Sequence, residues 1–171
     1  RLTRCPIPHD PDRGAEARGL FPDLPSEIRD LLAGAAGCSP YLFSLMAREA
    51  DWLAPALTGS PEAALDDVLT GLETLGSEAL GSALRRSKRR VALLAGLTDL
   101  GGVWPLEAVT GALTRLADTA VDLGMKALVA DEIRRGRLPG AVAGDAATAA
   151  GMFALAMGKM GAGELNYSSD I

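Results

Sequence analysis

The chain has 171 residues, 17 Lys+Arg against 22 Asp+Glu, a formal net charge of -5 and 48% hydrophobic residues. This apolar content argues against disorder, and the apolar runs are far shorter than the roughly 18 residues of a membrane span. The acidic balance and the 4% of aromatic residues disfavour nucleic-acid binding, which uses basic surfaces and stacking rings. The two cysteines lie far apart in the sequence, which is more typical of a protein in a reducing compartment than of one held together by disulfides. We therefore expect a soluble, cytoplasmic protein with neither a nucleic-acid nor a membrane partner.

The amino-terminal segment, residues 1–25, contains five prolines. Proline lacks a backbone donor and disfavours helix in the residue before it, so this segment is predicted to be irregular. A helical region is predicted to follow over residues 26–137. Ser26 is expected to cap its first helix, while Ser39-Pro40 and Ser60-Pro61 place serine at a cap and proline at the first helical position.

Two long helices are predicted in the second half of this region. One begins after Gly76-Ser77 and runs toward Leu97. The other follows Pro105, where apolar residues recur every three or four positions. It is expected to end near Gly136, because glycine readily takes the left-handed conformation of a helix end. Its apolar positions are Leu106, Val109, Leu113, Leu116, Ala120, Leu123 and Ala127.

A dense group of cations lies on the first of these long helices. This basic cluster consists of Arg85, Arg86, Lys88, Arg89 and Arg90. On a helix these positions spread over much of the circumference, which favours a solvated face. The alternative is a docking patch for an acidic partner or a nucleotide phosphate. The two tryptophans, at 52 and 104, are interpreted as core anchors.

The carboxyl end differs in kind from the helical region. After a predicted linker, residues 138–150, the six apolar residues 152–157 have the length of a buried strand. The signature segment, residues 158–171, then combines glycines with Lys159 and ends in polar residues and an acid. Its spacing matches neither the P-loop nor the dinucleotide fingerprint. A glycine loop around a phosphate and a tight turn between two elements both remain open.

The signature segment resembles the signature of bacterial glutamine synthetase adenylyltransferases, whose pattern is close to G-K-x-G-G-x-E-L-N-Y-S-S-D-I-D. Ala162 stands where that family usually has glycine. The chain before the segment looks like the amino-terminal helical region of the family. The matching residues are Gly158, Lys159, Gly161, Glu164, Leu165, Asn166, Tyr167, Ser168, Ser169, Asp170 and Ile171.

The resemblance implies a fold and a set of site residues. The fold is mainly α in this chain, with the helical region leading into the first strand and glycine loop of a polymerase β-like nucleotidyltransferase α+β domain. Residues 151–171 would be the incomplete start of that domain. The resemblance places the phosphates of ATP or ADP at Gly158, Lys159, Gly161 and Ser169. It makes Asp170 the catalytic, Mg²⁺-binding first acid of an Asp-x-Asp pair, and paired carboxylates of this kind suit Mg²⁺.

The resemblance also implies a function. Enzymes of this family attach AMP to a tyrosine of glutamine synthetase and remove it, with PII signalling protein as a regulator, which controls nitrogen assimilation. Asn166-Tyr167 with Ile171 looks more like the amino-terminal, removing copy. We expect the isolated 171 residues to be inactive, because a single acid is a poor Mg²⁺ site. The alternatives are a non-catalytic helical interaction module and a related nucleotidyltransferase such as a PII uridylyltransferase.

Overall fold

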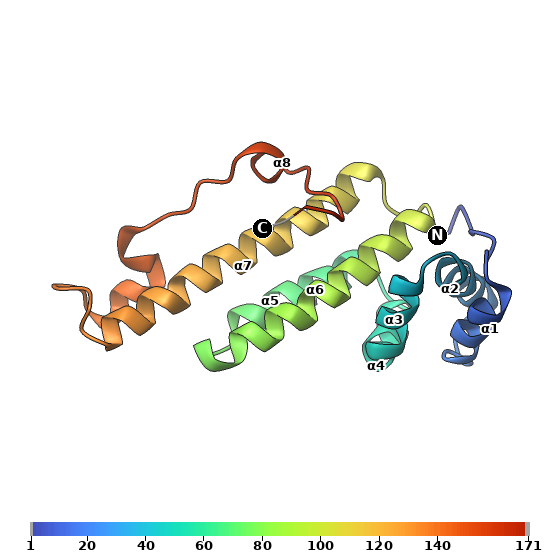
Figure 1. Cartoon of the computed structure of the whole chain (residues 1–171), viewed down its shortest axis with the longest axis horizontal. Coiled ribbons are helices and arrows are strands. Elements are labelled where there is room, and N and C mark those ends of the chain that lie inside the picture. Colours follow the sequence, from blue (N-terminus) through green and yellow to red (C-terminus); the bar gives the residue numbers. More distant parts are fainter. Residues whose placement is uncertain (1, 170–171) are drawn as a thin grey trace.

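The computed structural model describes residues 2–169, and every regular element in that range is helical. Figure 1 shows the short helices of the amino-terminal third gathered at one end and two long helices extending away from them. The elements, in chain order, are α1 (Pro11–Gly19), α2 (Ser26–Cys38), α3 (Pro40–Arg48), α4 (Ala50–Ala56), α5 (Pro61–Glu73), α6 (Ser77–Leu100), α7 (Leu106–Arg134), the 3-10 helix η1 (Ala143–Gly151) and α8 (Gly158–Gly161).

Two of the three predicted serine caps are confirmed. The Ser39 hydroxyl accepts from the N–H of Leu42 at 3.2 Å, and that of Ser60 accepts from the N–H of Ala63 at 3.2 Å. The prediction for Ser26 is wrong, because the helix already includes this residue and Pro25 precedes it without a side-chain cap. A pattern alone leaves helix ends uncertain by one or two residues.

The predicted end of the longest helix is confirmed in detail. Gly136 has φ of +68° and its N–H donates to the carbonyl of Ile133 at 2.9 Å. The N–H of Arg137 donates to the carbonyl of Glu132 at 2.9 Å. These two bonds form a Schellman motif, which requires a left-handed residue and therefore favours glycine.

The prediction that residues 1–25 are wholly irregular is wrong, because α1 occupies Pro11–Gly19. Pro11 stands in the first turn, where its missing N–H leaves no hydrogen bond unmade. Asp10 caps this helix by accepting from the N–H of Arg13 at 3.0 Å. The proline-rich segment thus contains a helix that begins at Pro11, and the number of prolines alone does not indicate it.

The amino-terminal segment packs closely on α2. The Arg13 guanidinium donates to the carbonyls of Ala36 and Gly37, at 2.7 and 2.8 Å, and so satisfies acceptors at the end of that helix. A methyl group on Gly34 would overlap the Pro6 carbonyl oxygen. Glycine at this position therefore allows the segment to approach the helix backbone.

We expect Gly34→Ala to lower the free energy of unfolding by about 1–3 kcal/mol, because the Pro6 backbone must move to admit the methyl group. Gly71→Ala is the matched control: it lies in α5 with no atom within 4 Å of the added carbon. That change should raise stability by about 0.5–1 kcal/mol. Chemical denaturation of both variants measures the difference, and equal effects would contradict the close packing.

Helix α6 joins two hydrophobic clusters. Its Leu93 and Leu97 pack with α1–α4, whereas Val91 and Leu94 pack with α5 and α7. The interpretation of Trp104 as a core anchor is confirmed: it is buried in the second cluster, and its Nε1–H donates to Glu62 at 2.6 Å. Trp52 is half-buried and contacts both clusters. Helix α6 thus contributes buried side chains to both hydrophobic clusters.

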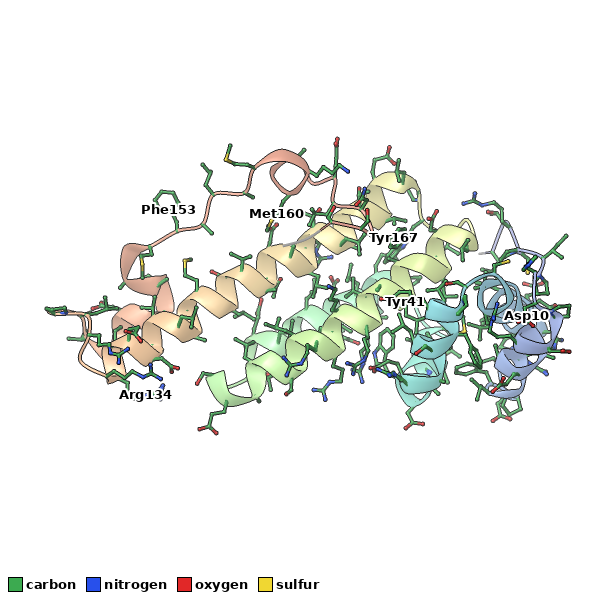
Figure 2. The ribbon with its side chains drawn as sticks, viewed as in Figure 1. Asp10, Tyr41, Arg134, Phe153, Met160 and Tyr167 are labelled. Atoms are coloured by element: carbon green, nitrogen blue, oxygen red, sulfur yellow. The ribbon has the colours of Figure 1, made fainter. Side chains whose placement is uncertain are left out.

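The predicted buried strand at residues 152–157 is wrong for the structure described. These residues follow η1 as an extended strap with no strand pairing, and Phe153 and Leu155 are 83% and 77% exposed. Figure 1 shows the strap running back along α7, and Figure 2 shows Phe153 projecting away from the helices. A strand needs a neighbouring strand for its backbone groups, and residues 2–169 supply none. Within the same range, no helix is long and apolar enough to cross a membrane.

Candidate functional site

The glycines of the signature segment form a short turn. Gly158 and Gly163 have φ of +58° and +75°, and the N–H of Glu164 donates to the carbonyl of Lys159 at 2.7 Å. A side chain on Gly161 would meet the Ala156 carbonyl oxygen. The turn thus accounts for three glycines, and it leaves Lys159 exposed to solvent.

The next residues of the signature segment lie on α7. Leu165 is only 5% exposed, and its N–H donates to the Thr114 hydroxyl at 3.3 Å. Thr114 in turn donates to the carbonyl of Thr110 at 2.9 Å. One buried leucine and one buried hydroxyl therefore attach the signature segment to the long helix.

A second attachment reaches α6. The Tyr167 hydroxyl lies 3.4 Å from Oδ2 of Asp99. Desolvation and the neighbouring Asp99 carboxylate raise the pKa of Tyr167 well above its usual range, so the phenol stays neutral. Figure 2 shows Tyr167 close to the helices at the end of the bundle where Tyr41 also lies.

The last described residues form a compact polar turn. The Asn166 Oδ1 accepts from the N–H and the hydroxyl of Ser168, both at 3.2 Å, and from the Ser169 hydroxyl at 2.8 Å. In this conformation the donor of Ser169 is used within the turn. Asn166 keeps its amide group as a donor, since these contacts involve only its oxygen.

A pocket of about 530 Å³ separates this turn from the helices; we call it the signature pocket. Most of its lining is apolar, and the lining includes two cations of the basic cluster, Arg85 and Lys88. The lining residues from the helices are Tyr41, Leu84, Arg85, Lys88, Ala92, Leu113, Leu116, Ala117, Ala120 and Val121, and those from the signature segment are Leu165, Asn166, Tyr167 and Ser169.

Of the four predicted site residues that the structure describes, only Ser169 lines this pocket. Gly158, Lys159 and Gly161 lie on α8 and are not among the lining residues. Asp170 lies outside the described residues. For Arg85 and Lys88 the sequence left open a solvated face and a docking patch for an acidic partner or a nucleotide phosphate. Their spacing of three places them on one helix face, and both line the pocket.

Two other members of the basic cluster have a structural role. Arg89 and Arg90 donate to the carboxylate of Glu49, at 2.7 and 2.9 Å, and the Arg90 guanidinium lies 5.1 Å from the centre of the Trp52 ring. Burial opposes ionisation of Glu49, but the hydrogen bonds from Arg90 and Arg89 outweigh it and lower the pKa of this carboxyl. The solvated-face interpretation thus fails for these two arginines.

The described residues do not form a Mg²⁺ site. Among residues 2–169, no three His, Cys, Asp or Glu side chains are placed to hold a metal ion together. Mg²⁺ binding needs several oxygen ligands in a near-octahedral arrangement. The expected metal ligand, Asp170, lies outside this range.

These features describe a helical platform, formed chiefly by α6 and α7, on which the signature segment lies. Residues 30–171 match the sequence model described as glutamate-ammonia ligase adenylyltransferase. The chain therefore belongs to the glutamate-ammonia ligase adenylyltransferase family, as its signature segment predicted.

Three relatives show the extent of the similarity, each named bifunctional glutamine synthetase adenylyltransferase/adenylyl-removing enzyme. The protein from Bradyrhizobium sp. strain BTAi1 is 44% identical over all of this chain and 18% of its own length. The protein from Rhodopseudomonas palustris strain CGA009 is 41% identical over 96% of this chain and 17% of its own length. The protein from Caulobacter vibrioides strain CB 15 is 42% identical over 82% of this chain and 15% of its own length. This chain thus spans less than a fifth of these relatives. No solved structure matches it.

Proposed function

We propose that this chain is part of an enzyme that removes AMP from, and attaches AMP to, a tyrosine of glutamine synthetase. The observation that carries the proposal is the family match over residues 30–171, which includes the whole signature segment. The family match favours this function over a PII uridylyltransferase. A purely structural helical module would not need the signature residues that follow the glycine turn.

In the removing reaction, an oxygen of inorganic phosphate attacks the phosphorus of AMP-tyrosine. The bond between phosphorus and the tyrosine oxygen breaks, the tyrosine oxygen takes a proton, and ADP leaves. Gly158, Lys159, Gly161 and Ser169 are the residues we propose for binding the phosphates. The exposure of Lys159 beside a glycine turn supports this role, because its ammonium group is free to meet an anion.

Further parts of the proposal rest on the family resemblance. Asp170 is the proposed catalytic residue and metal ligand, with Mg²⁺ as cofactor and ATP or ADP as nucleotide. Mg²⁺, when bound, would neutralise charge on the phosphate oxygens. The proposed partners are glutamine synthetase and a PII signalling protein, and the proposed location is the cytoplasm.

The test uses the longer protein that contains this chain. With adenylylated glutamine synthetase, phosphate and Mg²⁺, we expect Asp170→Asn to slow ADP release by about 100-fold or more, because a lost carboxylate weakens charge stabilisation in the transition state. Asp23→Asn, at an exposed position, is the matched control and should retain full activity. The isolated 171-residue chain is expected to release no ADP. Full activity of Asp170→Asn would overturn the metal assignment.

A further inference from the structure

Asp99 is an acid in the last turn of α6, at the end of the helix where a negative charge is unfavourable. The free carbonyl groups of a helix end carry partial negative charge, so cations are preferred there. The last turn of α6 contains no basic residue. The Asp99 carboxylate therefore needs groups from other parts of the chain, and two segments supply them.

The first of these is the amino-terminal segment, which packs on the turn that follows α6. The N–H groups of Thr3 and Arg4 donate to the carbonyl of Gly101, at 2.9 and 3.2 Å. The Thr3 hydroxyl donates to the carbonyl of Gly102 at 2.9 Å. The Arg4 guanidinium donates to the carbonyl of Asp99 at 2.7 Å and lies 4.0 Å from the carboxylate of the same residue. Arg4 thus brings a cation to this helix end and holds the backbone of Asp99.

The second segment is the signature segment, which contributes the phenol of Tyr167. The Tyr167 hydroxyl is the donor of the 3.4 Å hydrogen bond to Oδ2 of Asp99, since a carboxylate only accepts. Desolvation and this carboxylate both raise the pKa of Tyr167, so the phenol keeps the proton that it donates. Asp99 therefore connects the amino-terminal segment to the signature segment.

The signature segment is attached to two different helices at two nearby points. Leu165 is bonded through its N–H to Thr114 on α7, and Tyr167 is bonded through its hydroxyl to Asp99 on α6. A chain held at one point can pivot about it, whereas a chain held at two points has a fixed direction. Tyr167 precedes Asp170 by three residues. Within the described part of the chain, its bond is the last one from the signature segment to a helix.

We propose that Asp99 is a positioning residue for the transfer of AMP. Asp99 holds the Tyr167 phenol at the end of α6, Arg4 holds Asp99, and the signature segment thereby keeps the direction from which the chain continues to Asp170. Displacing a catalytic group slightly slows a reaction strongly, so alignment of this kind contributes to the rate. The inference rests on the proposed function and deepens it, because it gives α6 and the amino-terminal segment a part in the reaction.

The contact is tested first in the 171-residue chain. Tyr41→Phe leaves Tyr167 as the only tyrosine, so the ultraviolet absorbance of phenolate reports on Tyr167 alone. Adding Asp99→Asn should shift the phenol titration to lower pH, because the carboxylate that opposes a second negative charge is gone. Asp66→Asn also removes an exposed carboxylate from an ion pair, and this matched control should leave the titration unchanged. Circular dichroism defines the pH range in which the helices remain folded, and an unchanged titration in Asp99→Asn within that range would overturn the contact.

The role in the reaction is tested in the longer protein, with adenylylated glutamine synthetase, phosphate and Mg²⁺. We expect Asp99→Asn to lower kcat for ADP release about fivefold, the equivalent of one hydrogen bond. The KM for adenylylated glutamine synthetase should stay within about twofold, because the change affects alignment and not docking. Tyr167→Phe should give the same loss, and the double variant should be no slower than either single variant, since both remove the same bond. Asp66→Asn should keep full activity.

Two results would overturn the positioning role. One is a double variant whose loss is the product of the two single losses, which would mean that Asp99 and Tyr167 act independently. The other is full activity of Asp99→Asn beside an inactive Asp170→Asn, which would leave the proposed function intact. Full activity of Asp170→Asn would instead overturn the metal assignment and with it the alignment of Asp170 by Asp99, whereas the phenol titration would still decide whether Asp99 holds Tyr167.

Discussion

Replacing Glu49 by glutamine is expected to lower the free energy of unfolding by about 2 kcal/mol, in the range of hydrogen bonds to charged groups. Glu49 is 5% exposed and accepts from both Arg89 and Arg90. Its neutral replacement keeps the shape but loses the attraction to two guanidinium groups. Since Glu49 lies between α3 and α4 and the arginines lie on α6, the change should loosen the contact of α3 and α4 with α6. Urea denaturation measures the change in the free energy of unfolding.

Asp66→Asn is the matched control. Asp66 pairs with Arg115 at 2.7 Å, but both side chains are more than half exposed, and such pairs contribute about 0–1 kcal/mol. The pH dependence gives a second readout: because the pKa of folded Glu49 is lowered, its contribution is present above the unfolded value near 4.5 and is lost as pH falls through the folded value. Glu49→Gln should remove this acid-dependent loss. Equal stabilities of the two variants would contradict the assignment.

The long helices could be predicted from sequence because their signals are local. Apolar residues that recur every three or four positions predict α7. Gly136, which adopts the left-handed conformation, predicts where this helix ends. The caps at Ser39 and Ser60 follow from the adjacent prolines. Each of these signals lies within a few residues of the structure it predicts.

The features that the sequence did not predict depend on contacts between distant parts of the chain. Glu49 lies about 40 residues from its arginine partners, and Thr114 is 51 residues from Leu165. No periodicity within the basic cluster reveals that two of its members face one carboxylate and two others face a pocket. The family resemblance identified the signature segment, but it carried no information on which helices that segment touches.

The apolar residues 152–157 show a different limit. Their composition is that of a buried strand, yet a buried strand needs a neighbouring strand to pair with, and residues 2–169 contain none. Helix α7 passes nearby, with apolar side chains such as Val121 and Met125 lining a pocket together with Phe153 and Leu155. Sequence composition thus indicates a preference for burial without determining whether it is satisfied.

The strongest test of how the platform supports the signature segment is Leu165→Ala. Removing this buried side chain should cost about 2–3 kcal/mol of local stability, since it deletes apolar contact with the helices. We expect the amide protons of residues 164–169 to exchange about 30- to 150-fold faster by hydrogen–deuterium exchange. The helices themselves should keep their thermal midpoint, because their own two clusters remain intact.

Leu155→Ala is the control for this change, since it makes the same substitution on a side chain that is 77% exposed. Exchange in residues 164–169 should then match the unmodified chain. Because Leu165 stands between the glycine turn and Asp170, faster opening of this segment should also slow ADP release in the longer protein, whereas Leu155→Ala reports only on the strap. Unchanged exchange in Leu165→Ala would show that the signature segment is positioned by contacts other than this leucine, with Tyr167 and Asp99 as the next pair to test.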